Sequence, residues 1–278
     1  MTPDAPATEA VAIPEARRDG VAAFIQIESL NKTFVGQDGE PVVALEGVDL
    51  GVRRGEFVTI VGPSGCGKST LLSLVAGLLE ATAGEIRIGG TRIAEPYTDL
   101  GFVFQNDLLL DWRTVTGNVL LPCVMGGLDE SAHVDRAREL LASVGLEGFE
   151  GKRPFELSGG MRQRVALCRA LLLDPPMLLM DEPFGALDAL TREQMQVDLQ
   201  TIWYQTQKTV LFVTHSISEA VFLSDRVIVM TPRPGAIRAI LDIDLERPRD
   251  LNVHDTPRFT GIVHEIRLMF QEMGVIHR

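Results

Sequence analysis

An eight-residue stretch of the sequence, Gly62–Ser69, has the residue types and spacing that suit phosphate binding. It reads Gly62-Pro63-Ser64-Gly65-Cys66-Gly67-Lys68-Ser69, which matches the pattern G-x-x-x-x-G-K-S. Glycines let the backbone turn its N–H groups toward a phosphate, and a following helix adds the positive end of its dipole. We expect Lys68 to reach the β- and γ-phosphates of a nucleotide and the Ser69 hydroxyl to sit on Mg²⁺. The stretch, extended to Thr70, therefore predicts a nucleotide-binding loop.

Polar residues also follow three apolar runs that are expected to form buried strands. Asp181 with Glu182, Gln105 and His215 each come directly after such a run. Ligands of an open parallel sheet bind at the carboxyl ends of its strands, so these side chains are candidates for one site. Asp181 can hold Mg²⁺ through water, Glu182 can take a proton from an attacking water, and Gln105 can reach the metal or that water. For Gln105 and His215, a plain strand-end role is an alternative that the residues leave open.

Two further features suit contact with a nucleotide. Ser158-Gly159-Gly160 opens an expected helix, and such a start is a second anion-binding site on physical grounds. A serine N-cap with a loose first turn explains the same residues. Phe34 offers a flat apolar ring for an adenine base, although considered alone an aromatic residue is more often part of the core.

The elements that must position these residues alternate between short apolar runs and amphipathic segments. The run before the phosphate-binding stretch is apolar and β-branched, and the run after it is a helix that Gly77 can end. A turn of hairpin type is expected at 36–39. Residues 106–122 lack a clean period, which predicts an irregular, partner-facing segment. Strands are expected at 24–30, 42–50, 56–61, 84–90, 100–104, 177–180, 210–214 and 226–230, and helices at 70–76, 129–144 and 188–206.

The two ends of the chain differ from its middle. Residues 1–22 are rich in Ala, Pro and Glu without an apolar period, which predicts a disordered leader. Residues 241–278 are expected to form a tail with an amphipathic helix over about 257–273, opened by Thr256 and Pro257. Its apolar positions follow a 3.6-residue period and should pack on the main domain. They are Phe259, Ile262, Val263, Ile266, Met269, Phe270 and Met273.

Composition sets the outer limits on function. The chain has 278 residues and a net charge of −12, which argues against a main role on nucleic acid. No apolar run is long enough to span a membrane, and no secretory signal is expected at the N-terminus. The three cysteines predict reduced thiols in a cytosolic protein. Cys66 lies beside Lys68 and a helix N-terminus, and both favour a thiolate. We therefore expect Cys66 to react with maleimide.

Taken together, these motifs resemble those of the nucleotide-binding subunit of ATP-binding cassette (ABC) transporters over roughly residues 24–240. Residues 62–69 are similar to the Walker A loop, Leu157–Met161 to the signature motif, and Leu178–Glu182 to Walker B. The remaining matches are Gln105 with the Q-loop, 186–188 with the D-loop, His215 with the switch histidine, and Phe34 with the adenine-stacking aromatic. The sequences of residues 104–119, 158–161 and 232–235 resemble those of the nitrate, sulfonate and taurine importer group. The sequence departs from it at Asp111, where proline is expected, and at Ser216, where aspartate is usual.

The resemblance implies a fold and a set of partners. The fold class is α/β, a P-loop NTPase of the ABC nucleotide-binding-domain type. Its core sheet is mostly parallel, with an antiparallel β subdomain and an inserted helical subdomain at about 106–172, all within an ATPase domain at 23–240. Two subunits would close as a homodimer around ATP and Mg²⁺, so that Ser158–Gly160 of one faces the Walker loop of the other. Lys68, Gln105, Glu182 and His215 would serve hydrolysis, and Ser69, Gln105 and Asp181 the metal.

The implied partners are integral membrane permease subunits, docked near 105–118, and indirectly a periplasmic or lipid-anchored solute-binding protein. This would place the chain in the cytoplasm, peripheral to the inner face of the plasma membrane. Two other functions stay open. One is a soluble ABC-type ATPase in a non-transport role, and the other is an importer subunit for a pyrimidine or thiamine precursor. A small-molecule kinase would leave Ser158–Met161 without a purpose.

Overall fold

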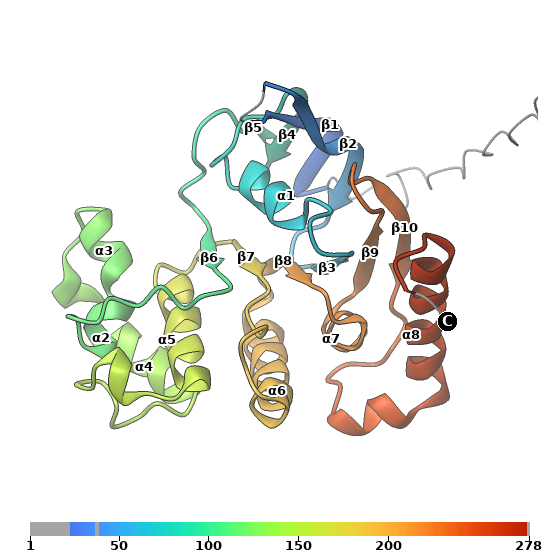
Figure 1. Cartoon of the computed structure of the whole chain (residues 1–278). Helices are drawn as coiled ribbons and strands as arrows, with labels where there is room; N and C mark the ends of the chain where they lie inside the picture. The colour runs from blue at the N-terminus through green and yellow to red at the C-terminus, as the bar shows by residue number, and fades with distance from the viewer. Residues whose placement is uncertain (1–22, 37–38, 277–278) are drawn as a thin grey trace, which may run out of the picture.

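The structure, a computed structural model, describes residues 23–36 and 39–276. Two β-sheets and several groups of helices make up this part of the chain (Figure 1). The predicted leader at 1–22 lies outside the described residues, as do two positions of the hairpin turn expected at 36–39. The strands that flank this turn, β1 (Ile25–Val35) and β2 (Pro41–Val52), pair antiparallel as predicted.

The central sheet has six strands in the order β10-β9-β3-β8-β7-β6. The strands from β9 to β6 run parallel, whereas β10 is antiparallel to β9. Because parallel strands in register end at one edge of the sheet, the residues after β3, β6, β7 and β8 come close together. The bounds are β3 Phe57–Val61, β6 Gly101–Val103, β7 Met177–Asp181, β8 Thr209–Thr214, β9 Arg226–Met230 and β10 Ile237–Asp242.

A second, antiparallel sheet packs over one face of the central sheet. Its order is β2-β1-β4-β5, with β4 at Ala83–Ile88 and β5 at Thr91–Arg92. The inward residues of this sheet form one apolar cluster with the helix α1 (Lys68–Val75) and with one face of the central sheet. This packing fixes α1, and therefore the loop before it, between the two sheets (Figure 1).

The segment between β6 and β7 forms a helical lobe (Figure 1). The prediction of an irregular segment over 106–122 was wrong in part, because two short helices begin inside it. Thr114 caps the first by accepting a hydrogen bond from Gly117 N, and the buried Asn118 amide bonds the backbone of Leu110 on both sides. The helices are α2 Val115–Val119, α3 Leu121–Met125, η1 Glu130–His133, α4 Val134–Ser143, η2 Pro154–Glu156 and α5 Gly159–Leu171. The predicted helix at 129–144 is thus a 3₁₀ turn followed by α4.

The tail continues the domain and packs on it. Strand β10, which the sequence analysis did not anticipate, extends the central sheet, so the domain boundary expected at 240 falls inside a strand. Helix α8 (Pro257–Glu272) begins after Thr256, whose hydroxyl accepts from Phe259 N, as the cap prediction required. Its stripe joins the core, packed against α7 (Ile217–Leu223) and η3 (Leu251–Asp255).

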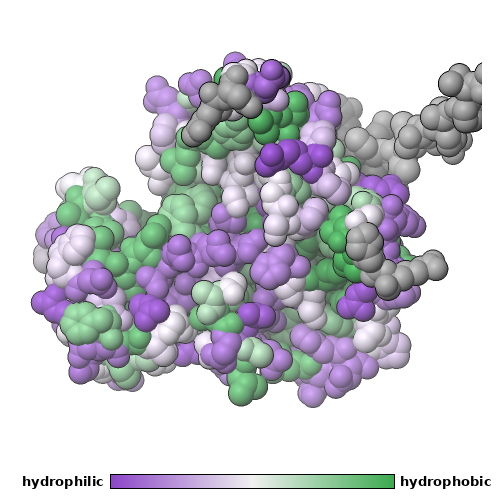
Figure 2. Space-filling model, viewed as in Figure 1, coloured by the Kyte–Doolittle hydropathy of each residue, from purple (hydrophilic) through white to green (hydrophobic). Residues whose placement is uncertain are grey.

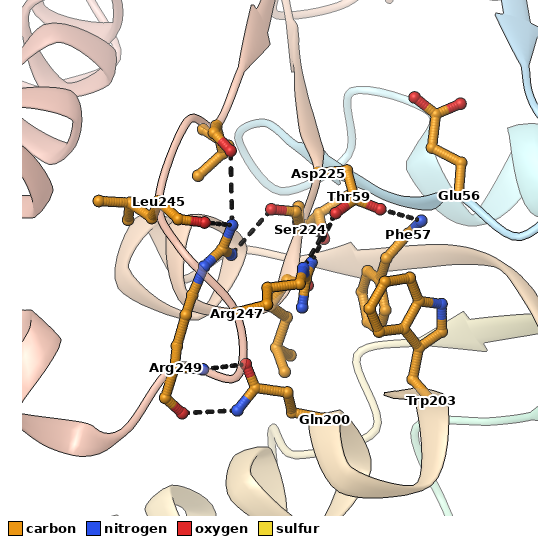
Figure 3. A network of polar contacts seen from close by, with 12 residues as sticks. Glu56, Phe57, Thr59, Gln200, Trp203, Ser224, Asp225, Leu245, Arg247 and Arg249 are labelled. Carbon is orange, nitrogen blue, oxygen red and sulfur yellow. Dashed lines mark hydrogen bonds and ion pairs between the residues drawn. The ribbon is translucent and has the colours of Figure 1, made fainter. Parts of the chain in front are cut away.

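Two arginines fasten the chain between β10 and α8 to the rest of the protein (Figure 3). Arg249 is buried and donates to the carbonyls of Val221, Phe222 and Ser224 at the end of α7. Its backbone exchanges two hydrogen bonds with the Gln200 amide of α6 (Ala189–Thr206). The Arg247 guanidinium lies over the Trp203 ring, 4.2 Å from its centroid, and pairs with Asp225 at 3.0 Å. Because Trp203 belongs to α6, the stacking is a second contact between this segment and α6.

Candidate functional site

The predicted phosphate-binding loop connects β3 to α1, as the sequence analysis required. Gly67 has a φ of +104°, and a Cβ on it would lie 2.7 Å from the Leu45 side chain, so the position favours glycine on two counts. Gly235, after β9, presses on the loop from another side, since its Cβ would collide with the Cys66 carbonyl. The loop is therefore held between β2 and the turn after β9.

Lys68 lies at the start of α1 with only 5% of its surface exposed. Its Nζ donates to the carbonyls of Gly62 at 2.9 Å and Pro63 at 3.1 Å, and lies 4.0 Å from Glu182 Oε1. The ammonium thus sits between the loop and the carboxylate that follows β7. This is where a cation can meet both the terminal phosphate of a nucleotide and the group that acts on it.

Ser69 and Asp181 come together at the strand edge. The Ser69 hydroxyl donates to Asp181 Oδ1 at 3.0 Å. Burial raises the pKa of Asp181, and the hydrogen bond from Ser69 opposes this shift. Hydroxyl and carboxylate oxygens are the ligands that Mg²⁺ prefers, and the described part of the chain holds no cluster of three ligating His, Cys, Asp or Glu residues. The pair fits a Mg²⁺ that takes its other ligands from nucleotide phosphates and water.

Glu182 and His215 form a second pair at the same edge. His215 Nδ1 lies 3.0 Å from Glu182 Oε2. Glu182 has a φ of +46°, a conformation that costs a residue with a side chain about 1–3 kcal/mol and is concentrated at functional sites. Its N–H donates to Val213 O of the neighbouring strand, which keeps the carboxylate at the end of β7. The carboxylate is thus held between the Lys68 ammonium and an imidazole.

Gln105 and Phe34 approach the site from two other elements. A Cβ on Gly185 would lie 3.6 Å from Gln105 Nε2 and 3.8 Å from Glu182 Oε2, so the amide and the carboxylate flank one glycine. The Phe34 ring on β1 is 38% exposed, with Lys32 Nζ 4.9 Å from its centroid. An exposed ring suits base stacking better than the core position that the residues had left open.

Ser158, Gly159 and Gly160 belong to the helical lobe. Ser158 is the N-cap of α5, and its Oγ accepts from Met161 N at 3.3 Å. A Cβ on Gly160 would lie 2.4 Å from Thr191 of α6, and one on Gly159 would lie 3.8 Å from Leu187. Gly159 and Gly160 therefore contact residues at the start of α6. The helical lobe to which these glycines belong lies apart from α1 (Figure 1).

The sequence analysis missed three polar residues beside the site. Thr214 and Glu219 are joined by a hydrogen bond, and Glu219 forms an ion pair with Arg192. A signal for one of them was present, because Glu219 is the one charged residue in the mostly apolar helix that follows His215. Nothing local marked its partner on α6.

The prediction that Cys66 is a reactive thiolate was wrong. The side chain is 1% exposed, and burial raises the pKa of its thiol despite the nearby Lys68. The Sγ atom belongs to the apolar cluster under the loop and lies 2.7 Å from the position that a Cβ on Gly62 would take. All three cysteines are free and buried, as reduced thiols were expected to be.

A mostly parallel sheet whose strand ends gather a phosphate loop, a Ser–Asp pair and a Glu–His pair defines a P-loop nucleotide-hydrolysing protein. The sequence profile described as ABC transporter matches residues 45–185. The chain belongs to the ABC transporter family, as its motifs had indicated, and is an ATPase of that family.

Relatives and solved structures agree with this assignment. The chain is 46% identical over 249 residues to the taurine import ATP-binding protein TauB of Rhizobium johnstonii, covering 88% of this chain and 95% of that one. It is 43% identical over 252 residues to the aliphatic sulfonates import ATP-binding protein SsuB of Bacillus cereus, covering 91% and 98%. The dimeric bacterial ABC transporter cassette MJ0796 superposes with a TM-score of 0.70 at 35% identity, over 80% of this chain and all of that one.

Proposed function

We propose that this chain is the ATP-hydrolysing subunit that powers import of a small solute such as taurine, another sulfonate or nitrate. The observation that carries the proposal is the convergence of Lys68, Glu182 and His215, with Ser69 and Asp181, at one sheet edge. The names of the two relatives support sulfonates as the solute class.

The proposed roles follow from this geometry. Lys68 and the amides of 62–70 bind the phosphates, and Phe34 stacks on the adenine. Ser69, Asp181 and Gln105 hold Mg²⁺, which supplies charge neutralisation at the phosphates. Glu182 takes the proton of the attacking water, and His215 orients that carboxylate and the γ-phosphate. Ser158–Gly160, which start α5 beside Leu187 and Thr191, complete the site of a second copy.

We assign the permease contact to the exposed apolar residues of the helical lobe. Trp112 is 72% exposed and Met125 82%, and Phe104 and Leu108 are also exposed. Figure 2 shows hydrophobic residues on the lobe that carries α2–α5. None of the helices in 23–36 and 39–276 is long and apolar enough to cross a membrane. Permease subunits would supply the membrane path, and a solute-binding protein would select the cargo.

Reconstitution tests the proposal. The chain is co-purified with the permease subunits whose genes adjoin its own, and the complex is placed in proteoliposomes with the matching binding protein. We expect ATP-dependent uptake of labelled taurine that excess ethanesulfonate suppresses. Hydrolysis that the permease complex neither stimulates nor couples to solute uptake would favour a soluble ABC-type ATPase. Uptake that only a thiamine or pyrimidine precursor suppresses would overturn the sulfonate assignment.

A further inference from the structure

The residues behind Glu182 and His215 form a continuous polar connection between helices α6 and α7. Arg192 on α6 lies with its Nε 3.7 Å from Glu219 Oε1 on α7. Glu219 is 5% exposed, and its other oxygen, Oε2, accepts from the Thr214 hydroxyl at 2.6 Å. The connection therefore runs from α6 to the last residue of β8.

On the α7 side, the connection encloses His215. Thr214 Oγ1 also accepts from Ser216 N at 3.0 Å, and Ser216 Oγ accepts from Glu219 N at 3.3 Å. Both chain neighbours of His215 are thus bonded to Glu219 or to its partner hydroxyl. The backbone at His215 is fixed while its imidazole, 59% exposed, stays free to meet a ligand.

On the α6 side, the connection holds the turn that follows Glu182. Arg192 Nη2 donates to Leu187 O at 2.8 Å, and its Nε donates to Phe184 O at 3.3 Å. The same turn is closed by Gly185 N, which donates to Glu182 O at 3.0 Å. One guanidinium therefore restrains the backbone that carries Glu182 in its strained conformation.

We infer that Arg192 and Glu219 are positioning residues that set the placement of Glu182 against His215. The inference rests on the proposed roles of those two residues in hydrolysis. A pure contribution to stability is the alternative, but a 3.7 Å ion pair whose arginine side chain is 34% exposed is a weak stabiliser. Burial raises the pKa of Glu219, and the Thr214 hydrogen bond and Arg192 oppose the shift, so both partners favour the charged carboxylate.

Conservative substitutions separate the two explanations. Arg192→Lys keeps the charge but loses the planar fork that reaches two carbonyls. Glu219→Gln keeps the shape but loses the charge, and Thr214→Val removes the hydroxyl that bonds both Glu219 and Ser216 N. We expect each to lower kcat about 10–100-fold, because small displacements of catalytic groups have effects of that size. The affinity for MgATP should stay within about threefold, since the phosphate loop is untouched.

The chain offers a matched control on the same helix. Asp198 of α6 pairs with Arg164 of α5 at 2.8 Å, away from the strand ends. Asp198→Asn breaks an α6 ion pair of similar kind and should leave kcat within about twofold. Melting temperatures of all variants are measured alongside, so that turnover is compared at equal folded fraction.

The double variant supplies the decisive measurement. Residues that act through one contact are non-additive, so Arg192→Lys with Glu219→Gln should lose no more turnover than the worse single variant. In a Glu182→Gln background the Glu219 substitution should have no further effect. Unchanged kcat in the single variants, an equal loss in Asp198→Asn, or a loss matched by weaker MgATP binding would each overturn the inference. If Glu182→Gln and His215→Ala themselves leave turnover unchanged, the proposed site fails instead.

Discussion

At the scale of single residues, the site is made of charges held in place by backbone groups. Lys68 is bound by two carbonyls of its own loop and faces the Glu182 carboxylate. Glu182 in turn meets the His215 imidazole. Phosphoryl transfer needs such fixed charges and a positioned water more than covalent chemistry, so small changes at these atoms should act on rate before they act on fold.

Glu182→Gln should lower turnover by about 10²–10⁴-fold while ATP binding is kept, because the change removes a general base at nearly equal volume. ATPase assays and equilibrium binding of a fluorescent ATP analogue measure the two effects. Glu193→Gln, an exposed carboxylate on α6, is the matched control. Turnover like that of the unaltered protein would remove Glu182 from the proposed role.

Asp181→Asn should stabilise the protein without nucleotide while weakening its response to Mg²⁺. Because burial raises the pKa of Asp181, the folded state binds a proton here more readily than the unfolded chain does. Stability should therefore fall as pH rises from the ordinary aspartate pKa of about 3.9 through the raised native value. Thermal melting across this range, with and without the substitution, measures the difference.

The amide should remove that loss at neutral pH and raise the melting temperature by about 2–4 °C for each kcal/mol recovered. Mg²⁺ added with ATP should then stabilise the variant less than the unaltered protein. A lower melting temperature in the variant would contradict the assignment of burial as the dominant cause.

At the scale of elements, the helices α6 and α7 each connect the site to the C-terminal tail. Their first residues lie beside Glu182 and His215, and their far ends meet the tail through Gln200, Trp203 and Arg249 (Figure 3). The tail thus stabilises the far ends of both helices. Arg249 donates to carbonyls at the end of α7, where backbone oxygens have no partner within the helix.

Arg249→Met should lower the free energy of unfolding by about 2–3 kcal/mol. Methionine keeps much of the buried stem, but the carbonyls of Val221, Phe222 and Ser224 lose a charged donor. Urea denaturation measures the change. Arg267→Met, on the exposed side of α8, should stay within about 0.5 kcal/mol. Equal effects of the two substitutions would show that the buried bonds carry no special weight.

At the scale of the whole molecule, the phosphate loop and the proposed second anion site at Ser158 lie on separate elements of one chain. The phosphate loop lies between the two sheets, whereas Ser158 starts α5 in the helical lobe beside Leu187 and Thr191. The solved structure of MJ0796 is dimeric. Closure of two copies would bring each Ser158 to the loop of the other.

In Glu182→Gln protein, ATP should therefore induce a dimer that Ser158→Arg prevents. The long cation would occupy the space into which the partner's phosphate must enter, while each monomer keeps its own Lys68 and Asp181. Size-exclusion chromatography with light scattering reports the dimer, and a fluorescent ATP analogue reports binding by the monomer. If the double variant still dimerises, or if its well-folded monomer no longer binds ATP, Ser158 does not serve the other subunit.

The sequence by itself determined the parts of this protein that are contiguous or periodic. The phosphate loop, the apolar strands that end in Asp181, Gln105 and His215, and the cap and stripe of α8 are all local patterns. A parallel sheet then brings strand ends to one edge whatever lies between them, so a candidate site followed from local information alone.

Only the tertiary structure decided which side chains are buried and which distant residues meet. The Cys66 thiol points into an apolar cluster built from both sheets, which reverses the reactivity expected from its neighbours in sequence. Arg192 and Glu219 lie on separate helices, and Arg249 reaches carbonyls more than twenty residues earlier. Desolvation and ion pairing depend on these long-range neighbours, because the energy of a charge is set by everything packed around it and not by its place in the chain.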